Sequence, residues 1–293
     1  MIRKAPQPDL VDLHVHSTVS DGALEPRDLV RLAAEVGLRA IALTDHDTVA
    51  GVPEALAAGR EFGIEIIPGV EIAAEFQAGV CHILGYFIDP ADGPLAELLA
   101  AARQGRDLRN AEILRKLSDL GLPLAPADLN CRAADGVLTR AHFAAAMVEK
   151  RYVKSMDEAF DRYLGAGKPA YVGRLRVTPE EAIQAIRRAG GLAALAHPRQ
   201  LARAAAETDR LFEQFAAAGL DAIETESPDH TANYARRYRA AAARLGLLEV
   251  GGTDWHGQGH GGIHLGLGRG RMAIHYAAVE RMKERLAARG RTN

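Results

Sequence analysis

Hydrophobic and polar side chains alternate strictly near the start of the chain. From residue 11 to residue 16, the odd positions are apolar, whereas Asp12, His14 and His16 occupy the even positions. A period of two predicts a β-strand with one buried face and one polar face. The pattern therefore points two histidines the same way at the end of a strand.

Helical and strand-like patterns then alternate along most of the chain. A helix is predicted from about Glu25 to Val36, because Pro26 suits a first turn and Gly37 suits a C-cap. Thr178 and Glu181 have the spacing of a capping box at the start of a later helix. Short apolar runs predict about seven core strands, the first at residues 10–16 and the others at residues 40–43, 64–67, 80–87, 192–196, 220–223 and 247–250. A regular eightfold barrel would need a further strand, such as residues 272–274.

One long segment interrupts this alternation. Residues 94–165 are rich in Ala, Leu and Arg and have a helical pattern, with breaks at residues 121–123 and near residues 135–136. We interpret this segment as a helical insertion that covers the active site. Residues 1–93 and 166–293 are then expected to form one α/β barrel.

Composition narrows the class of protein. With 293 residues and 48% hydrophobic content, the chain can bury a large core. Its net charge of -2 argues against binding duplex nucleic acid through bulk charge. No segment has the pattern of a signal peptide or a membrane span, so a cytoplasmic protein that does not contact membranes is expected. Cys81 and Cys131 form no CxxC pair, which argues against a disulfide framework or a thiolate zinc site.

Potential metal ligands occur where many of the apolar runs end. There are nine of them: His14, His16, Asp21, His46, Glu71, His82, His197, Asp254 and His256. A single histidine at a strand end is usually structural, but this set contains six of the 11 histidines. Imidazole and carboxylate ligands without thiolates suit manganese, iron or zinc, and the two oxygens of Glu71 can bridge two ions. Such a centre predicts hydrolysis of a phosphate ester.

The ordered motifs resemble the PHP family, the phosphoesterase superfamily named for bacterial DNA polymerase and histidinol phosphatase domains. They are His14-Val15-His16, Ser20-Asp21-Gly22, Thr44-Asp45-His46, Pro68-Gly69-Val70-Glu71, His82, His197-Pro198 and Asp254-Trp255-His256. The resemblance implies a distorted (β/α)7 barrel with two or three divalent metal ions at its C-terminal face.

The resemblance also implies a set of ligands for each ion. One metal would take His14, His16, Glu71 and Asp254. A second would share Glu71 and add His82 and His197, and a third would take Asp21, His46 and His256. We expect Glu71 and His256 to take part in catalysis. Asp45 is expected either to orient a neighbouring histidine or to handle a proton.

Basic residues of the insertion are candidates for substrate binding. Arg106, Arg109 and Asn110 share one helical face, Arg140 and His142 begin another helix after Thr139, and Lys168 follows the insertion. A guanidinium group can donate two hydrogen bonds to two oxygens of one phosphate. The basic side chains named above would therefore bind a phosphate if they face the barrel mouth. The alternative is a solvated helix face.

These segments are similar to the PHP group that hydrolyses nucleoside 3′,5′-bisphosphates and short 5′-phosphorylated oligonucleotides. We therefore expect a phosphatase, with manganese the favoured metal, that removes the 3′-phosphate and leaves a nucleoside 5′-monophosphate. Two alternatives are a small phosphomonoesterase of the histidinol-phosphate type and a 5′-3′ exonuclease acting on short oligonucleotides. A non-catalytic binding module is a third alternative, but it would not need a complete set of ligands.

Overall fold

The computed structural model describes residues 9–76, 79–130, 140–165, 167–172, 177–201, 205–257, 262–270 and 272–290. The chain divides into two compact units. Residues 1–99 and 177–293 form the first unit, and residues 100–176 form the second. The insertion predicted at residues 94–165 overlaps this second unit. Each unit is described separately below.

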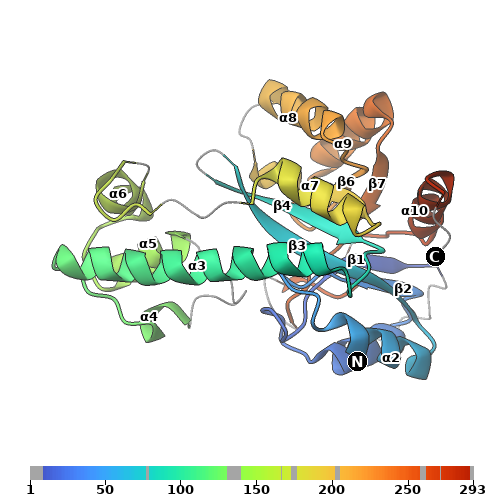
Figure 1. The fold of residues 1–293 in the computed structure, drawn as a ribbon, viewed down its shortest axis with the longest axis horizontal. Coiled ribbons are helices and arrows are strands. Elements are labelled where there is room, and N and C mark those ends of the chain that lie inside the picture. The colour runs from blue at the N-terminus through green and yellow to red at the C-terminus, as the bar shows by residue number, and fades with distance from the viewer. Residues whose placement is uncertain are drawn as a thin grey trace. The chain divides into compact units, whose positions relative to one another are not determined.

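A seven-stranded sheet is the centre of the first unit (Figure 1). Its strands are β1 (Val11–Val15), β2 (Ala40–Leu43), β3 (Glu65–Phe76), β4 (Gly79–Tyr86), β5 (Leu192–Leu195), β6 (Ala222–Glu226) and β7 (Leu248–Gly251). They lie side by side in the order of the chain, and the pairs β1–β2, β2–β3, β5–β6 and β6–β7 are parallel. The prediction of an α/β fold with seven strands is confirmed.

Strand β4 runs against both of its neighbours. It pairs antiparallel with β3, where Glu71 lies opposite Leu84 and Ala73 opposite His82, and antiparallel with β5. Glu71 and His82 are therefore diagonal neighbours on one face of a β-ribbon. This differs from the expectation that the candidate ligands stand at strand ends, because these two lie within their strands.

The sheet curls so that its first and last strands approach each other. The segment after β7 forms a bridge between Trp255 and Val15. Backbone hydrogen bonds reinforce it, since His16 donates to the Trp255 carbonyl (3.0 Å) and Trp255 donates to the His14 carbonyl (3.3 Å). The curl brings the end of β1 and the Asp254–His256 segment together although some 240 residues separate them.

Helices of the first unit pack against the sheet. They are α1 (Pro26–Glu35), α2 (Val52–Phe62), α7 (Pro179–Arg188), the 3₁₀ turn η2 (Pro198–Gln200), α8 (Ala205–Ala217), α9 (Ala232–Leu245) and α10 (Ala277–Ala288). Helix α2 packs against β3, α7 against β4 and β5, and α9 against β6 (Figure 1). The predicted capping box is confirmed, since Glu181 N donates to Thr178 Oγ1 (3.2 Å) and Thr178 N donates to Glu181 Oε2 (2.8 Å).

Apolar side chains fill the space between the sheet and these helices. One cluster contains Ile72 and Ile83 of the β-ribbon with Ile183 and Ile186 of α7. Burial on this scale stabilises the barrel by roughly 25 cal/mol per Å² of apolar surface. The core thus packs one face of the β-ribbon against α7. Among the helices that the structure describes, none is both long and apolar enough to cross a membrane.

The second unit is helical. Helix α3 (Gly93–Asp119) begins in the first unit and continues into the second, which also contains α4 (Ala127–Asn130), α5 (Arg140–Glu149), α6 (Met156–Ala159) and the π-helical turn η1 (Phe160–Leu164). Its core includes Ile113, Leu117, Phe143 and Met147.

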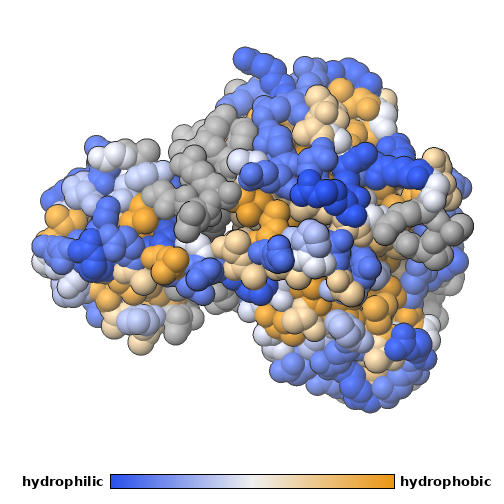
Figure 2. Space-filling view, in the orientation of Figure 1, coloured by the Kyte–Doolittle hydropathy of each residue, from blue (hydrophilic) through white to orange (hydrophobic). Residues whose placement is uncertain are grey.

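The surface of the described residues is mixed in character. On the face drawn in Figure 2, hydrophilic residues predominate and hydrophobic residues form separate patches.

Candidate metal centre

All nine predicted ligands belong to the first unit, and the structure brings them together. They reach the site from five places: β1 and the turn after it (His14, His16, Asp21), the end of β2 (His46), the β3–β4 ribbon (Glu71, His82), the end of β5 (His197) and the segment after β7 (Asp254, His256). Three groups of these side chains have ligand atoms close enough to share a metal ion. The first contains His14, His16, Glu71 and Asp254.

The carboxylate of Glu71 lies at the middle of the cluster. Its Oε1 is 2.8 Å from His82 Nδ1 and 3.2 Å from His197 Nε2. Its Oε2 is 3.1 Å from His14 Nε2, 3.1 Å from His46 Nδ1 and 3.3 Å from His16 Nε2. The side chain is fully buried. Two oxygens that each face several imidazoles are the arrangement that a bridging carboxylate requires.

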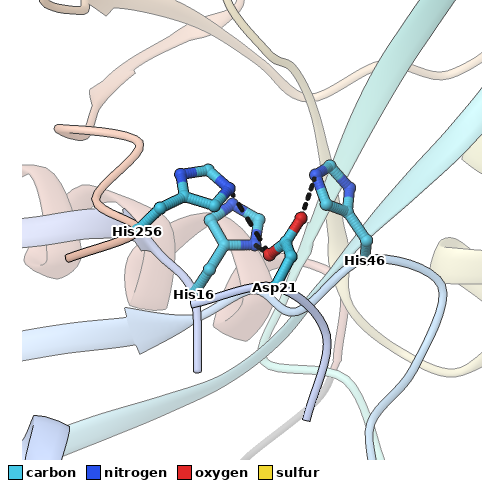
Figure 3. Close-up of side chains that lie close together, drawn as sticks. All are labelled: His16, Asp21, His46 and His256. Atoms are coloured by element: carbon cyan, nitrogen blue, oxygen red, sulfur yellow. Dashed lines mark ion pairs between the residues drawn. The ribbon is translucent and has the colours of Figure 1, made fainter. Parts of the chain in front are cut away.

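The second group surrounds Asp21 (Figure 3). Asp21 Oδ1 lies 3.4 Å from both His16 Nδ1 and His256 Nε2, and Asp21 Oδ2 lies 3.4 Å from His46 Nε2. His16 and His46 therefore face Asp21 with one ring nitrogen and Glu71 with the other. Each of them stands between two of the three groups.

The third group contains His46, Glu71 and His82. The resemblance instead implied that His197 completes the set with Glu71 and His82. In the structure His197 Nε2 lies 3.2 Å from both Glu71 Oε1 and His82 Nδ1, so it is in contact with this set. The resemblance also assigned His16 to one metal alone, whereas the geometry places it beside two groups.

The chemistry of the buried atoms fits divalent cations. His14 Nε2, both ring nitrogens of His16, His46 Nδ1 and Glu71 Oε2 are buried and make no hydrogen bond. Buried polar atoms are normally satisfied, so a group of them facing one point indicates a bound cation. Burial by itself raises the pKa of Glu71, but the nearby histidines hold it well below its usual range. The carboxylate is therefore charged and able to bind a metal.

Burial and charge also shift the pKa of His16. Burial alone lowers it, but the nearby carboxylates of Asp254, Glu71 and Asp21 raise it to about 10. Without a metal, His16 therefore holds a proton, whereas burial lowers the pKa of His46 to about 3 and keeps that ring neutral.

Asp45 contacts the loop that carries Asp21. Its Oδ1 accepts hydrogen bonds from Ser17 N and Ser20 Oγ, both at 2.7 Å, and its Oδ2 accepts one from Ser17 Oγ at 2.7 Å. Ser20 Oγ also lies 2.9 Å from Asp21 Oδ1. These hydrogen bonds hold the loop that carries Asp21, and the expected role of Asp45, either orienting a neighbouring histidine or handling a proton, stays a prediction.

Two further buried carboxylates support the site and were not predicted from the sequence. Asp12 accepts hydrogen bonds from Thr253 N (2.8 Å), Thr253 Oγ1 (2.5 Å) and Gly266 N (2.8 Å). Burial raises the pKa of Asp12 to about 6. Glu224, in the middle of β6, contacts His14 and the backbone of His197. Asp12 shares the polar face of β1 with His14, and this alternation was the signal available in the sequence.

The substrate-binding candidates all lie in the second unit. Arg106, Arg109 and Asn110 are buried on α3, and Asn110 Oδ1 accepts hydrogen bonds from Arg109 Nε (3.1 Å) and Nη2 (2.7 Å). Arg140 donates to the Leu164 carbonyl (3.4 Å), with its guanidinium 5.2 Å from the centre of the Tyr171 ring. His142 is half-buried on α5, and Lys168 is exposed. Thr139 lies outside the described residues. The buried α3 residues are not the solvated helix face that was the alternative expectation.

Comparison with known proteins points to one family. The model of the PHP domain matches residues 12–118. The 3′,5′-nucleoside bisphosphate phosphatase of Chromobacterium violaceum is 37% identical over 258 residues, covering 87% of this chain and 90% of that protein. A 5′-3′ exoribonuclease of Haemophilus influenzae is 38% identical over 84% of this chain and 89% of its own length. A structure from Bifidobacterium adolescentis, inferred to be a metal-dependent phosphoesterase, superposes with a TM-score of 0.72 at 29% identity and covers 96% of this chain and 97% of that one.

Proposed function

This chain belongs to the PHP family, and on that premise we propose that it removes the 3′-phosphate of nucleoside 3′,5′-bisphosphates to give nucleoside 5′-monophosphates. It is a phosphoric ester hydrolase that uses divalent metal ions. The observation that carries the proposal is Glu71, whose two oxygens face five imidazoles in a buried cluster. We propose that the nine clustered side chains hold the ions, with manganese as the natural metal.

Each part of the cluster has a distinct task in this proposal. Bound divalent cations would clamp the reacting phosphoryl group and make a water molecule acidic enough to attack at neutral pH. Glu71 holds the imidazoles in place and supplies negative charge, while Asp254 and Asp21 complete the two larger groups. His256 lies beside Asp21, 3.4 Å away, and is our candidate for taking part in catalysis as a member of the group around Asp21.

Basic side chains of the second unit would hold the phosphate that does not react. Arg106, Arg109, Asn110, Arg140, His142 and Lys168 are the candidates. An anchored second phosphate would align the reacting one, because remote binding energy also positions the reacting group. The Chromobacterium relative, whose name specifies a bisphosphate substrate, supports this choice of substrate class. A substrate of this class agrees with the expected cytoplasmic location.

The function is tested by comparing substrates on manganese-reconstituted protein. Adenosine 3′,5′-bisphosphate should give the highest kcat/KM, with adenosine 5′-monophosphate and inorganic phosphate as products. Adenosine 3′-monophosphate lacks the second phosphate and should be a poorer substrate. A preference for histidinol phosphate over every bisphosphate would overturn the assignment.

The anchor is tested by changing Arg140 to Ala. The loss of one charge-assisted contact, worth roughly 1.5–3 kcal/mol, should lower kcat/KM for the bisphosphate by about 10- to 150-fold. The 3′-monophosphate should lose less, and the metal content should not change. Arg115→Ala is the matched control, because Arg115 is exposed and pairs only with Glu112 and Asp119 among the ion pairs that the structure describes. Equal losses with both substrates would assign Arg140 to structure or to the reacting phosphate.

A second candidate function is 5′-3′ trimming of short oligoribonucleotides. The Haemophilus relative is named as such an enzyme and is as similar in sequence as the phosphatase. The same metal centre would cleave either ester. Successive release of mononucleotides from a 5′-phosphorylated pentaribonucleotide, at a kcat/KM above that for the bisphosphate, would make trimming the main activity.

A further inference from the structure

Glu224 is a fully buried acid of the first unit. It follows the apolar residues Ala222 and Ile223 in the middle of β6. Its Oε1 lies 3.1 Å from His14 Nδ1, and its Oε2 accepts a hydrogen bond from the backbone N–H of His197 at 2.5 Å. One carboxylate thus contacts two candidate ligands that come from different strands, β1 and the end of β5.

The contact with His14 determines which ring nitrogen can bind a metal. An ionised carboxylate only accepts hydrogen bonds, so His14 Nδ1 must carry the hydrogen. When a metal is bound, the lone pair of the neutral ring then lies on Nε2. That atom faces the candidate metal position, 3.1 Å from Glu71 Oε2 and 3.2 Å from Asp254 Oδ1. Glu224 therefore selects the tautomer and the ring orientation that a ligand needs.

The contact with His197 supports an uncommon backbone conformation. His197 has φ 24° and ψ 60°, in the left-handed region that non-glycine residues rarely adopt. Such a conformation persists only where surrounding contacts hold it. The hydrogen bond from His197 N to Glu224 Oε2 is one of these contacts. It helps to place His197 Nε2 at 3.2 Å from Glu71 Oε1.

We propose that Glu224 is a positioning residue of the metal centre, which fixes His14 as a ligand through Nε2 and holds His197 in place. The proposal rests on the metal-dependent function proposed above. It does not depend on the identity of the substrate. Glu224 acts through the two histidines and touches neither metal nor substrate.

The test replaces Glu224 by Gln. Both partners of the carboxylate are donors, so the amide –NH₂ group must face either His14 Nδ1–H or His197 N–H. The first orientation forces His14 to turn or to place its hydrogen on Nε2, and the second removes the support of His197. Loss of such a supporting contact typically weakens metal binding by about 10- to 100-fold.

The measurements are the manganese dissociation constants and the dependence of kcat on manganese concentration, with circular dichroism as the check of folding. We expect weaker manganese binding in Glu224→Gln, and kcat restored to within a few-fold of the parent by excess manganese. Glu226→Gln is the matched control, because Glu226 lies on the same strand but pairs with Arg239 on the surface. If Glu224→Gln does not fold, Glu224→Asp takes its place. Because Asp keeps the charge, this variant should show a smaller loss of manganese affinity than the loss of about 10- to 100-fold expected for Gln.

Two results would overturn the proposal. The first is a manganese affinity equal to that of the parent in a folded variant. The second is a loss of kcat that no concentration of manganese restores, which would assign Glu224 to catalysis or to the fold. A parent protein that binds manganese with Glu224 in this role but does not hydrolyse bisphosphates would refute only the proposed substrate.

Discussion

Replacing Glu71 by Gln is the sharpest test of the metal centre. The substitution keeps the shape of the side chain and removes its charge. It also turns one carboxylate oxygen into an –NH₂ group. In the parent protein Oε1 faces two imidazoles and Oε2 faces three. Whichever oxygen is replaced, at least two contacts at 2.8–3.3 Å lose their negatively charged partner.

The expected effect on turnover is large. Removal of one key group that stabilises charge in a transition state costs about 2.7–4 kcal/mol, or about 10²- to 10³-fold in kcat. Glu71 contacts two of the three ligand groups, so we expect a fall of at least about 100-fold.

The assay measures initial rates with saturating bisphosphate and manganese, together with the metal content of each variant. Glu65→Gln is the matched control, because Glu65 lies on the same strand and contacts Tyr276 and Lys283 away from the cluster. It should retain the activity of the parent. Near-normal turnover of Glu71→Gln with full metal content would refute the bridging role. A loss of bound metal together with activity would support it.

Three further predictions concern the metal, the pH and a close backbone approach. Chelation should abolish hydrolysis and Mn²⁺ should restore it at least as well as Mg²⁺, because imidazole-rich sites disfavour hard, strongly hydrated Mg²⁺; full activity in metal-free protein would reject the mechanism. In metal-free protein the pKa of His16 is about 10, against 6.5 in the unfolded chain, so the protonated ring contributes fully to stability below pH 6.5 and this contribution is lost as the pH rises towards 10. Thermal melts of chelated protein should show a melting temperature that falls over this interval. A melting temperature that rises would contradict the prediction. Gly252→Ala should reduce metal content and thermal stability, because an added Cβ would lie 2.2 Å from His14 Cβ, whereas Gly93→Ala, with no atom within 4 Å of its added Cβ, should leave both unchanged.

The sequence predicts the strands well because burial leaves a strong periodic signal. The apolar runs at residues 40–43 and 192–196 coincide closely with β2 and β5. Periodicity says nothing about the direction of pairing, however. The antiparallel course of β4 depends on the hairpin with β3, and so the place of His82 within the sheet could not be derived from the pattern.

The supporting residues of the site were harder to recognise than the ligands. Glu224 follows an apolar run and Asp12 stands between apolar residues, patterns that also fit an ordinary strand. Their role depends on partners that are distant in sequence, such as His14 for Glu224 and Thr253 for Asp12. Only the three-dimensional contacts distinguish a buried, hydrogen-bonded acid from an exposed one.

Protons and metal ions compete for the same buried atoms in this site. Burial lowers the pKa of His14, but the charges of Glu71, Asp254 and Glu224 raise it well above its usual value. The carboxylates that attract protons to the imidazoles are the ones that would attract a divalent cation. A cation must therefore displace protons from His14 and His16 before it can use their ring nitrogens. This displacement becomes easier as the pH rises. The negative charge of the carboxylates therefore weakens the metal-free fold at alkaline pH, and the same charge strengthens metal binding at that pH.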